Sequence, residues 1–325
     1  MSDDFIQFAY AMSGPDRGRR LTDDERIAAA LAAPEPAWIH MRTDRPETRA
    51  WIARHLDYIA EPIRTALLQD ETRPRATVHG DGVLVILRGV NTNPGAEPED
   101  MVAVRLWVQA GRIVSLGRRP LASLSELAEV VGSGAGPDRA GAFLCGLVER
   151  LNARIDAYLT RTDDETDLLE ENVLRDPDKG LRARVTDLRG ELVDIRRFLV
   201  PQREAVATLA RTQVDLIDPD DRGRLEEALE RLTRAVEEVE SLRDRLIVVK
   251  DELNTALSDR LNKNLYLLSV ISAVFLPLGV LTGLMGINLA GMPGANWPPA
   301  FWVFTGLLGV ILAIQIAILW VLRWF

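Results

Sequence analysis

Residues 264–288 of the chain read NLYLLSVISAVFLPLGVLTGLMGIN, and this stretch contains no Asp, Glu, Lys or Arg. As an α-helix it would extend about 37 Å, which is enough to cross a hydrocarbon core of roughly 30 Å. A second long apolar run covers residues 299–323. A buried core helix is the alternative for one such run, but two of them favour a transmembrane hairpin joined by a loop over 289–298.

The basic residues around these runs predict their orientation. Arg260 and Lys263 precede the first run and Arg323 lies at the end of the second, whereas the connecting loop has no basic residue. The positive-inside bias therefore places both chain ends in the cytoplasm and the loop outside. Pro277 lies inside the first run, where its missing N–H is expected to bend or loosen the helix. Two spans cannot enclose a polar path, so conduction would require several copies around one axis.

Composition excludes several classes of function. The chain has 325 residues and a net charge of -9, which argues against a nucleic-acid partner. Its single cysteine, Cys145, excludes an internal disulfide and is expected to be a buried thiol. The N-terminal sequence MSDDFIQFAY lacks the pattern of a cleaved signal peptide. No phosphate loop, nucleophile elbow or metal-ligand motif is present, so an enzyme is not expected.

Residues 1–135 have the pattern of an α/β domain. Strand-like runs occur at AWIHM, RATVHG, GVLVILRGV, VAVRLWVQ and RIVSLG, separated by turn signals such as Gly80-Asp81-Gly82. Helix starts of capping-box form are expected at Thr22 and Ser123. The three histidines are scattered singly, and packing or surface roles are favoured over metal ligation: His40, His55 and His79.

Long charged helices follow the α/β domain. Residues 136–221 are expected to form two antiparallel helices, and 222–263 a stalk helix that continues into the first span without an intervening Gly or Pro after Arg224. The whole rod would comprise about 65 residues and extend about 95 Å. The acidic segment 163–171 is either a solvated face or a cation-attracting rim that senses divalent ions.

One face of this rod carries a distinct stripe, because its members recur every three or four residues. The cytoplasmic part of the stripe is polar: Asp251, Asn254, Ser258 and Asn262. The part within the membrane is small or aliphatic: Leu265, Leu268, Ser272, Leu276, Gly279 and Gly283. A wet pore with a hydrophobic constriction would have this arrangement, and packing against neighbouring helices is the alternative.

The sequence ISAVFLPLGVLTGLMGIN resembles the end of the first span in the CorA superfamily of divalent-cation transporters, whose signature is Gly-Met-Asn. The signature reads Gly286-Ile287-Asn288 in this chain. The continuation LAGMPGANW resembles the zinc-transporting ZntB branch, where a Gly-rich loop follows. Magnesium-transporting members usually carry an acidic residue just after the Met-Pro pair, whereas this chain has Gly294.

The resemblance implies a CorA-like funnel: an α/β N-terminal cytoplasmic domain, long helices forming a stalk, and a C-terminal two-helix transmembrane hairpin. It further implies a homopentamer in the inner membrane, surrounded by lipid, with the first span lining a central pore. On this reading Gly286, Ile287 and Asn288 form the outer mouth. The aliphatic stripe lines the conduit, and the polar stripe beginning at Asp251 forms the cytoplasmic mouth.

A ring of Asn288 amides would offer neutral acceptors to the waters of a hydrated cation and hold it weakly enough to release it. Asn288 is therefore the expected transient metal contact, with Asp251 as a second candidate and no resident cofactor. Zn²⁺ uptake is the leading function. The alternatives are a CorA-like channel for Mg²⁺, Co²⁺ or Ni²⁺ and a non-conducting sensor or scaffold. The resemblance also implies proton coupling, although Tyr266 is the sole titratable side chain between 264 and 322.

Overall fold

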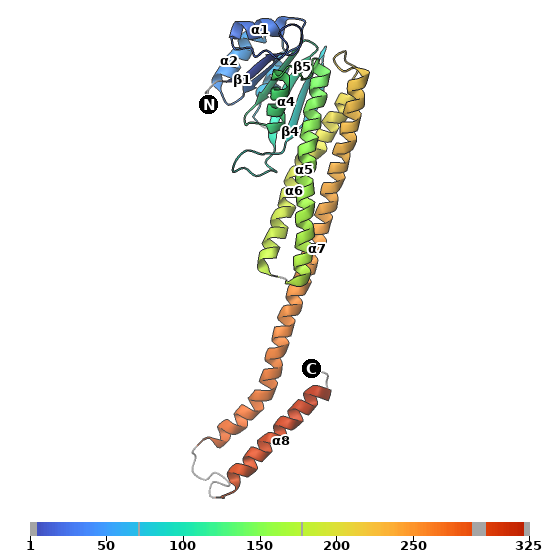
Figure 1. Ribbon diagram of the computed structural model, residues 1–325. Helices are drawn as coiled ribbons and strands as arrows, with labels where there is room; N and C mark the ends of the chain where they lie inside the picture. Colours follow the sequence, from blue (N-terminus) through green and yellow to red (C-terminus); the bar gives the residue numbers. More distant parts are fainter. Residues whose placement is uncertain (1–4, 71, 177, 288–296, 322–325) are drawn as a thin grey trace. The chain divides into compact units, whose positions relative to one another are not determined.

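The computed structural model describes residues 5–70, 72–176, 178–287 and 297–321 (Figure 1). The predicted contact Asn288 and most of the 289–298 loop lie outside these residues. The chain divides into two compact units, Met1–Lys250 and Asp251–Phe325. Helix α7 (Pro219–Met285) contributes residues to both.

The first unit contains one six-stranded sheet. Its strand order is β1-β2-β6-β5-β4-β3, in which β2 and β6 are parallel and every other neighbouring pair is antiparallel. Five strands coincide with the predicted runs, whereas β1 was not predicted. The strands are β1 (Ile6–Ala11), β2 (Ala37–Arg42), β3 (Arg75–His79), β4 (Gly82–Gly89), β5 (Val102–Gln109) and β6 (Arg112–Gly117). The turn signal at Gly80 is confirmed, because this residue has a φ of 62° between β3 and β4.

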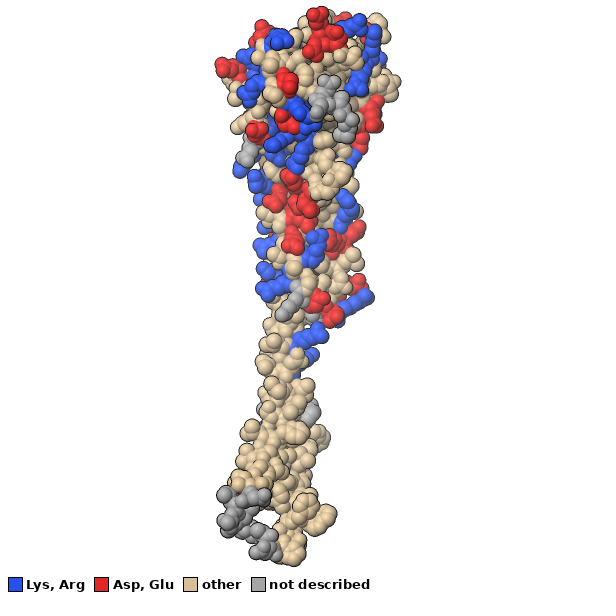
Figure 2. Space-filling model, turned by 90° about the vertical axis from the view of Figure 1, so that its left-hand side faces the viewer, with Lys and Arg blue, Asp and Glu red and all other residues tan. Residues whose placement is uncertain are grey.

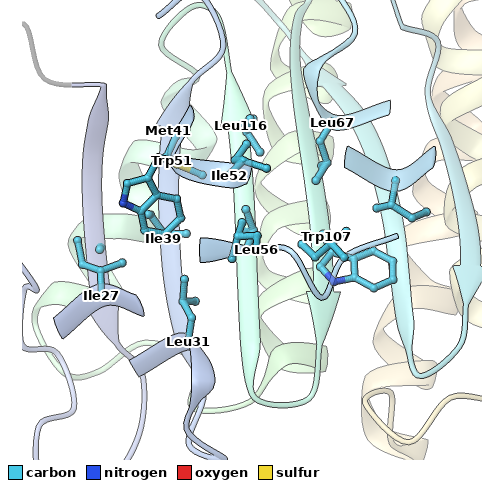
Figure 3. Packing of buried hydrophobic residues seen from close by; sticks show 14 of the residues in the cluster. Ile27, Leu31, Ile39, Met41, Trp51, Ile52, Leu56, Leu67, Trp107 and Leu116 are labelled. Carbon is cyan, nitrogen blue, oxygen red and sulfur yellow. The ribbon is translucent and has the colours of Figure 1, made fainter. Parts of the chain in front are cut away.

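Helices α1 (Asp24–Ala32), α2 (Pro46–His55) and α3 (Glu61–Leu68) cover one face of the sheet (Figure 3). Apolar side chains at alternate strand positions, such as Ile39 and Met41, pack against them because successive residues of a strand face opposite sides. On the opposite face Trp38 lies edge-on to Phe143 of α5, with ring centroids 4.7 Å apart. Burial of this apolar surface on both faces is the main favourable contribution to the fold.

The predicted helix starts are correct in place but wrong in detail. Asp23, and not Thr22, caps α1: its Oδ1 accepts from the backbone N–H of Glu25 at 3.0 Å. Helix α4 (Ala122–Gly132) begins before Ser123, so this residue lies inside the helix. The buried hydroxyl of Ser123 donates to the carbonyl of Arg150 at 3.3 Å. Asp and Thr are both preferred at the N-cap position, so the sequence alone does not decide whether Thr22 or Asp23 caps the helix.

Two long helices, α5 (Ala140–Arg175) and α6 (Lys179–Arg211), lie within the predicted range 136–221, and α6 ends ten residues before the end of that range. Helix α7 runs beside them (Figure 1). Residues at spacings of three and four are buried along α7 from Leu225 to Leu253. Arginine–carboxylate pairs join the helices: Arg224 to Glu149, Arg196 to Glu240 and Arg245 to Asp163. The buried stripe and these pairs account for the association of the three helices.

The predicted rod of about 65 residues is present as one helix, α7, which has 67 residues and extends about 100 Å. It continues through Pro277 and ends at Met285. A second apolar helix, α8 (Ala300–Val321), runs alongside its last part (Figure 1). Both α7 and α8 are long and apolar enough to cross a membrane. Figure 2 shows the Lys, Arg, Asp and Glu side chains in blue and red on the sheet and the long charged helices. The described residues of the two apolar segments are tan.

Candidate functional site

The predicted stripe lies on α7 within the second unit, from Asp251 to Gly283. Every member is exposed in the single chain except Asn254, which is half-buried. The exposure is large for the leucines, reaching 69 % for Leu276. The described residues therefore supply no cover for this face, which is typical of a surface that contacts lipid or other copies.

A different face of α7 is partly covered, and it follows the i, i+4 spacing of one helix side. Its members are Val270, Val274, Leu278 and Leu281. On α8 the covered positions are Phe304, Leu308, Ile311, Leu312, Gln315 and Leu319. These two sets lie where the helices run alongside each other (Figure 1). At 100° per residue, the centre of the stripe is about 165° around α7 from the covered face, so it points away from α8.

The two serines of the stripe have different hydrogen-bonding states. Ser258 donates its hydroxyl to the carbonyl of Asn254 at 2.8 Å, so only its oxygen lone pairs face outward. Ser272 is exposed and has no hydrogen-bond partner among the described residues. A free hydroxyl can both donate to and accept from water. Ser272 is thus the one hydroxyl in the aliphatic part of the stripe, and it is free to bond to water.

The end of α7 carries the described part of the predicted outer mouth. The backbone N–H of Gly286 donates to the carbonyls of Thr282 and Gly283, at 2.9 and 3.1 Å, and so closes the last helical turn. Ile287 follows and is exposed. Asn288 lies outside the described residues, so the structure describes two of the three signature residues, Gly286 and Ile287. Gly279 and Gly283 have open space where a Cβ would be, so the chain's own packing does not require glycine there.

Gln315 is a polar residue of α8 that the sequence interpretation did not select. Its amide oxygen is buried and has no hydrogen-bond partner in the described part of the chain. It lies on the covered side of α8, and the stripe lies on the opposite, uncovered side of α7. A lone amide in an otherwise apolar run was the signal that could have identified it, because unpaired polar groups are costly in a membrane.

His40 and Cys145 are buried in the first unit, whereas His55 is half-buried and His79 is exposed. His40 is buried on β2, and burial lowers its pKa to about 4, so the imidazole is neutral at pH 7. Its Nδ1 lies 2.9 Å from the hydroxyl oxygen of Ser115. Cys145 is buried, as expected, and burial raises the pKa of its thiol to about 12. Among the described residues, no three His, Cys, Asp or Glu side chains form a group that could hold a metal.

The acidic segment 163–171 is largely paired with arginine. Arg245 of α7 contacts Asp163, Asp167 and Glu170 within 3.0 Å, and Arg184 of α6 holds Glu165. The segment is therefore more than a solvated face, because it joins α5 to both neighbouring helices. Its expected role as a cation-attracting rim is weakened, since bound guanidinium groups already neutralise most of these carboxylates.

Comparison with known proteins supports the architecture and the family. The chain is 36% identical over 322 residues to the divalent cation transporter CmaX of Pseudomonas aeruginosa, covering 98% of this chain and 96% of that protein. It is 32% identical over 315 residues to the zinc transport protein ZntB of Yersinia enterocolitica, covering 95% and 93%. The solved structure of full-length CmaX superimposes with a TM-score of 0.83, at 36% identity and 99% coverage of both chains.

The model of the family described as CorA-like Mg2+ transporter protein matches residues 35–323, which include the sheet, the long helices and the two apolar helices. The resemblance seen at the Gly-Ile-Asn segment thus extends over nearly the whole chain. The predicted fold class is confirmed, and so is the assignment to transporters rather than enzymes. The chain belongs to the CorA-like family of membrane transporters for divalent cations.

Proposed function

We propose that the protein takes up Zn²⁺ through a conduit that several copies form around one axis, with the stripe of α7 lining it. The observation that carries this proposal is the position of the stripe on the face of α7 opposite α8. Helix α8 covers one side of α7, and the opposite side of α7 can therefore contact the same side of α7 in further copies. A closed ring of identical subunits is the simplest assembly that buries such a face in every copy.

The chemistry of the stripe suits a passing ion. Leu265, Leu268 and Leu276 would form an apolar constriction, and Ser272 would interrupt it with a hydroxyl that can bond to the ion's water shell. Described residues offer no cluster of soft ligands that would trap Zn²⁺ tightly. The predicted outer ring of Asn288 amides and the cytoplasmic ring at Asp251 remain part of the proposal, as do five-fold symmetry, an inner-membrane location and cytoplasmic termini.

Zinc is proposed ahead of other cations because the loop after the Gly-Ile-Asn segment has no carboxylate, and a relative named zinc transport protein aligns over 95% of this chain. A hydrated Mg²⁺ ion releases water reluctantly and is favoured by nearby negative charge. The second candidate is a channel for Mg²⁺, Co²⁺ or Ni²⁺. It is favoured by the family's description as Mg2+ transporters and by the relative CmaX, whose name specifies no single cation.

Reconstitution of the full-length protein into liposomes containing a fluorescent metal indicator tests the proposal. Zn²⁺ entry should exceed Mg²⁺ entry, and comparison with and without an imposed pH gradient measures proton coupling. Robust Mg²⁺ entry without Zn²⁺ entry would reverse the order of the two candidates. If no divalent cation enters liposomes that contain correctly assembled protein, the non-conducting scaffold is the better description.

Two substitutions address the ends of the proposed conduit. Asn288→Ala removes the amide ring, and the Zn²⁺ flux should fall by about ten-fold because no neutral acceptor then replaces part of the ion's hydration. Asp251→Asn should reduce flux mainly at low ionic strength, because it removes negative charge that concentrates cations at the cytoplasmic end. Asp259→Asn, an exposed carboxylate on a different side of α7, is the matched control for overall charge.

A further inference from the structure

A hollow of about 510 Å³ lies beside strands β4 and β5 in the first unit. Its volume falls within the usual range for small-molecule sites, roughly 300–1,000 Å³. The charged residues that line it are Arg88, Arg105, Arg118, Arg119, Asp70 and Asp100. Four arginines against two aspartates make this hollow positive, although the chain as a whole has a net charge of -9. This local reversal of charge requires an explanation.

Arg105 is the deepest of these groups. It lies in the middle of β5, paired with Ile86 of β4 and Leu116 of β6, and is only 3% exposed. Its Nη2 donates to the backbone carbonyl of Asp70 at 2.8 Å. Its Nε and Nη1 have no hydrogen-bond partner among the described residues. A buried cation with unsatisfied donors is costly, and a bound anion is one partner that would satisfy them.

Arg88 adds a second charge, and it forms no ion pair among the described residues. Its Nη1 donates to the carbonyl of Met101 at 2.7 Å and its Nη2 to that of Thr72 at 3.0 Å, and the guanidinium lies 4.0 Å from the ring centroid of Phe198. All three partners are uncharged. Burial, followed by the positive charges of Arg105 and Arg119, lowers the pKa of Arg88 to about 10, although the charge of Asp100 acts in the opposite direction. The arginines therefore repel one another in the absence of an anion.

The remaining two arginines differ in their pairing. Arg119 contacts both carboxylate oxygens of Asp100, with Nη2 and Oδ1 3.1 Å apart, so its charge is already compensated. Arg118 is exposed and has no ion pair within the described residues. Three guanidinium groups without an ion pair among the described residues thus line one hollow: Arg88, Arg105 and Arg118. Apart from Asp100, which pairs with Arg119, the one carboxylate among the described lining residues is that of Asp70. Several guanidinium groups that converge on one space are typical of sites that recognise phosphate oxygens.

We propose that this hollow binds a small phosphate-bearing anion. A multiply charged phosphate group offers several acceptor oxygens and more than one negative charge, which matches the three arginines without an ion pair better than a single carboxylate does. The free inorganic ion and an organic phosphate share this chemistry. The volume of the hollow leaves room for a group attached to the phosphate. This site is separate from the stripe of α7 and does not depend on the transported cation.

Isothermal titration of the detergent-solubilised full-length protein with pyrophosphate, in buffer free of divalent ions, tests the proposal. One pyrophosphate should bind per chain, and acetate at matched ionic strength should not compete. Titration with ADP distinguishes the two sources of phosphate. Tighter binding of ADP than of pyrophosphate assigns an organic phosphate, and weaker binding assigns the inorganic ion.

Arg105→Gln should weaken pyrophosphate binding by at least about ten-fold, because it removes a desolvated charge. Arg118→Gln is the second variant. Its side chain is exposed, so the substitution leaves the packing of the fold unchanged, and a several-fold weakening of binding is expected. Arg182→Gln, an exposed arginine of α6 outside the hollow, is the control for net charge and should bind as the wild type does. Absence of binding to the wild type, or equal loss in the Arg182 variant, overturns the proposal.

Discussion

Arg245 of α7 donates from its Nη1 to Oδ1 of Asp163 on α5, at a distance of 2.6 Å. The same guanidinium also contacts Asp167 and Glu170, so one cation is shared among three carboxylates. The carboxylates and the neighbouring charged groups raise the pKa of Arg245 further above its usual value. A single arginine thus neutralises three carboxylates of α5, and these ion pairs join α7 to α5.

Replacing this arginine should expose that cluster to metal ions. For Arg245→Gln we expect a loss of about 1 kcal/mol in the free energy of unfolding, since the groups are partly exposed. We also expect millimolar Mg²⁺ to raise the melting temperature of the variant more than that of the wild type, because three carboxylates are left without a cation. Thermal melts in detergent with and without Mg²⁺ measure both effects.

The control for this experiment is Arg231→Gln, which removes an exposed i, i+4 pair with Glu227. It should cost a few tenths of a kcal/mol and leave the Mg²⁺ response unchanged. An equal Mg²⁺ response in the wild type and in both variants would show that Arg245 does not shield the cluster.

His40 predicts a pH dependence of stability. The hydroxyl of Ser115 donates to the carbonyl of Ile39 at 3.1 Å, so its oxygen accepts from Nδ1 of His40, which therefore carries the proton of the neutral imidazole. Burial lowers the pKa of His40 from 6.5 to about 4, so below pH 6.5 the unfolded chain binds a proton that the folded chain does not. Stability should thus fall as the pH falls from 6.5 towards 4, by about 1.4 kcal/mol per unit.

Melting curves of the wild type and His40→Gln between pH 7.5 and 4 measure this contribution as the difference between their two slopes. The glutamine retains a donor that can reach Ser115 but does not titrate. The variant should lose less stability than the wild type over this range. Parallel curves would mean that carboxylates elsewhere in the chain, and not His40, determine the acid sensitivity.

Glycine positions on the stripe distinguish a conduit from a lipid-facing surface. Gly279→Leu places a side chain where this chain has open space, so the fold of the single chain should tolerate it. If copies meet along the stripe, the added leucines crowd their axis and the cation flux should fall by about ten-fold or more. Liposome flux and the oligomeric state of the purified protein are the two measurements.

The matched control is Gly309→Leu on α8, which also has open space around its Cα and is exposed. Its flux should remain within a factor of about two of the wild type, because α8 lies opposite the stripe. Unchanged flux in Gly279→Leu, with an intact oligomer, would place the stripe against lipid.

Gly141 is required by packing in the first unit. A Cβ at this position would overlap the carboxylate of Asp221, which is 1% exposed and ion-paired with Arg139. Gly141→Ala should therefore destabilise the protein by about 1–3 kcal/mol, the usual cost of overpacking. Gly190→Ala, in the exposed interior of α6 with open space around it, should instead be neutral or stabilise by up to about 1 kcal/mol. Comparison of the two melting temperatures checks both signs.

Local patterns predicted much of the architecture. The uncharged runs and the three-and-four spacing along α7 predicted one long helix entering an apolar hairpin, because helical hydrogen bonds and helical faces involve residues close in sequence. Five strands were predicted for the same reason, from short apolar runs between turn signals. Strand β1 was missed because its IQFAYA segment is defined by its pairing with β2 rather than by a local signal.

The remaining features join residues that are distant in the chain. His40 and Ser115 are separated by 75 positions and Arg245 and Asp163 by 82, so no local spacing indicates that they meet. The unpaired donors of Arg105 become visible only when its neighbouring strands bury it. Periodicity placed the stripe on one side of α7, but the packing of α8 decided that this side is the uncovered one. Chain connectivity determines local conformation, whereas the partners of a buried charge depend on how separate segments pack.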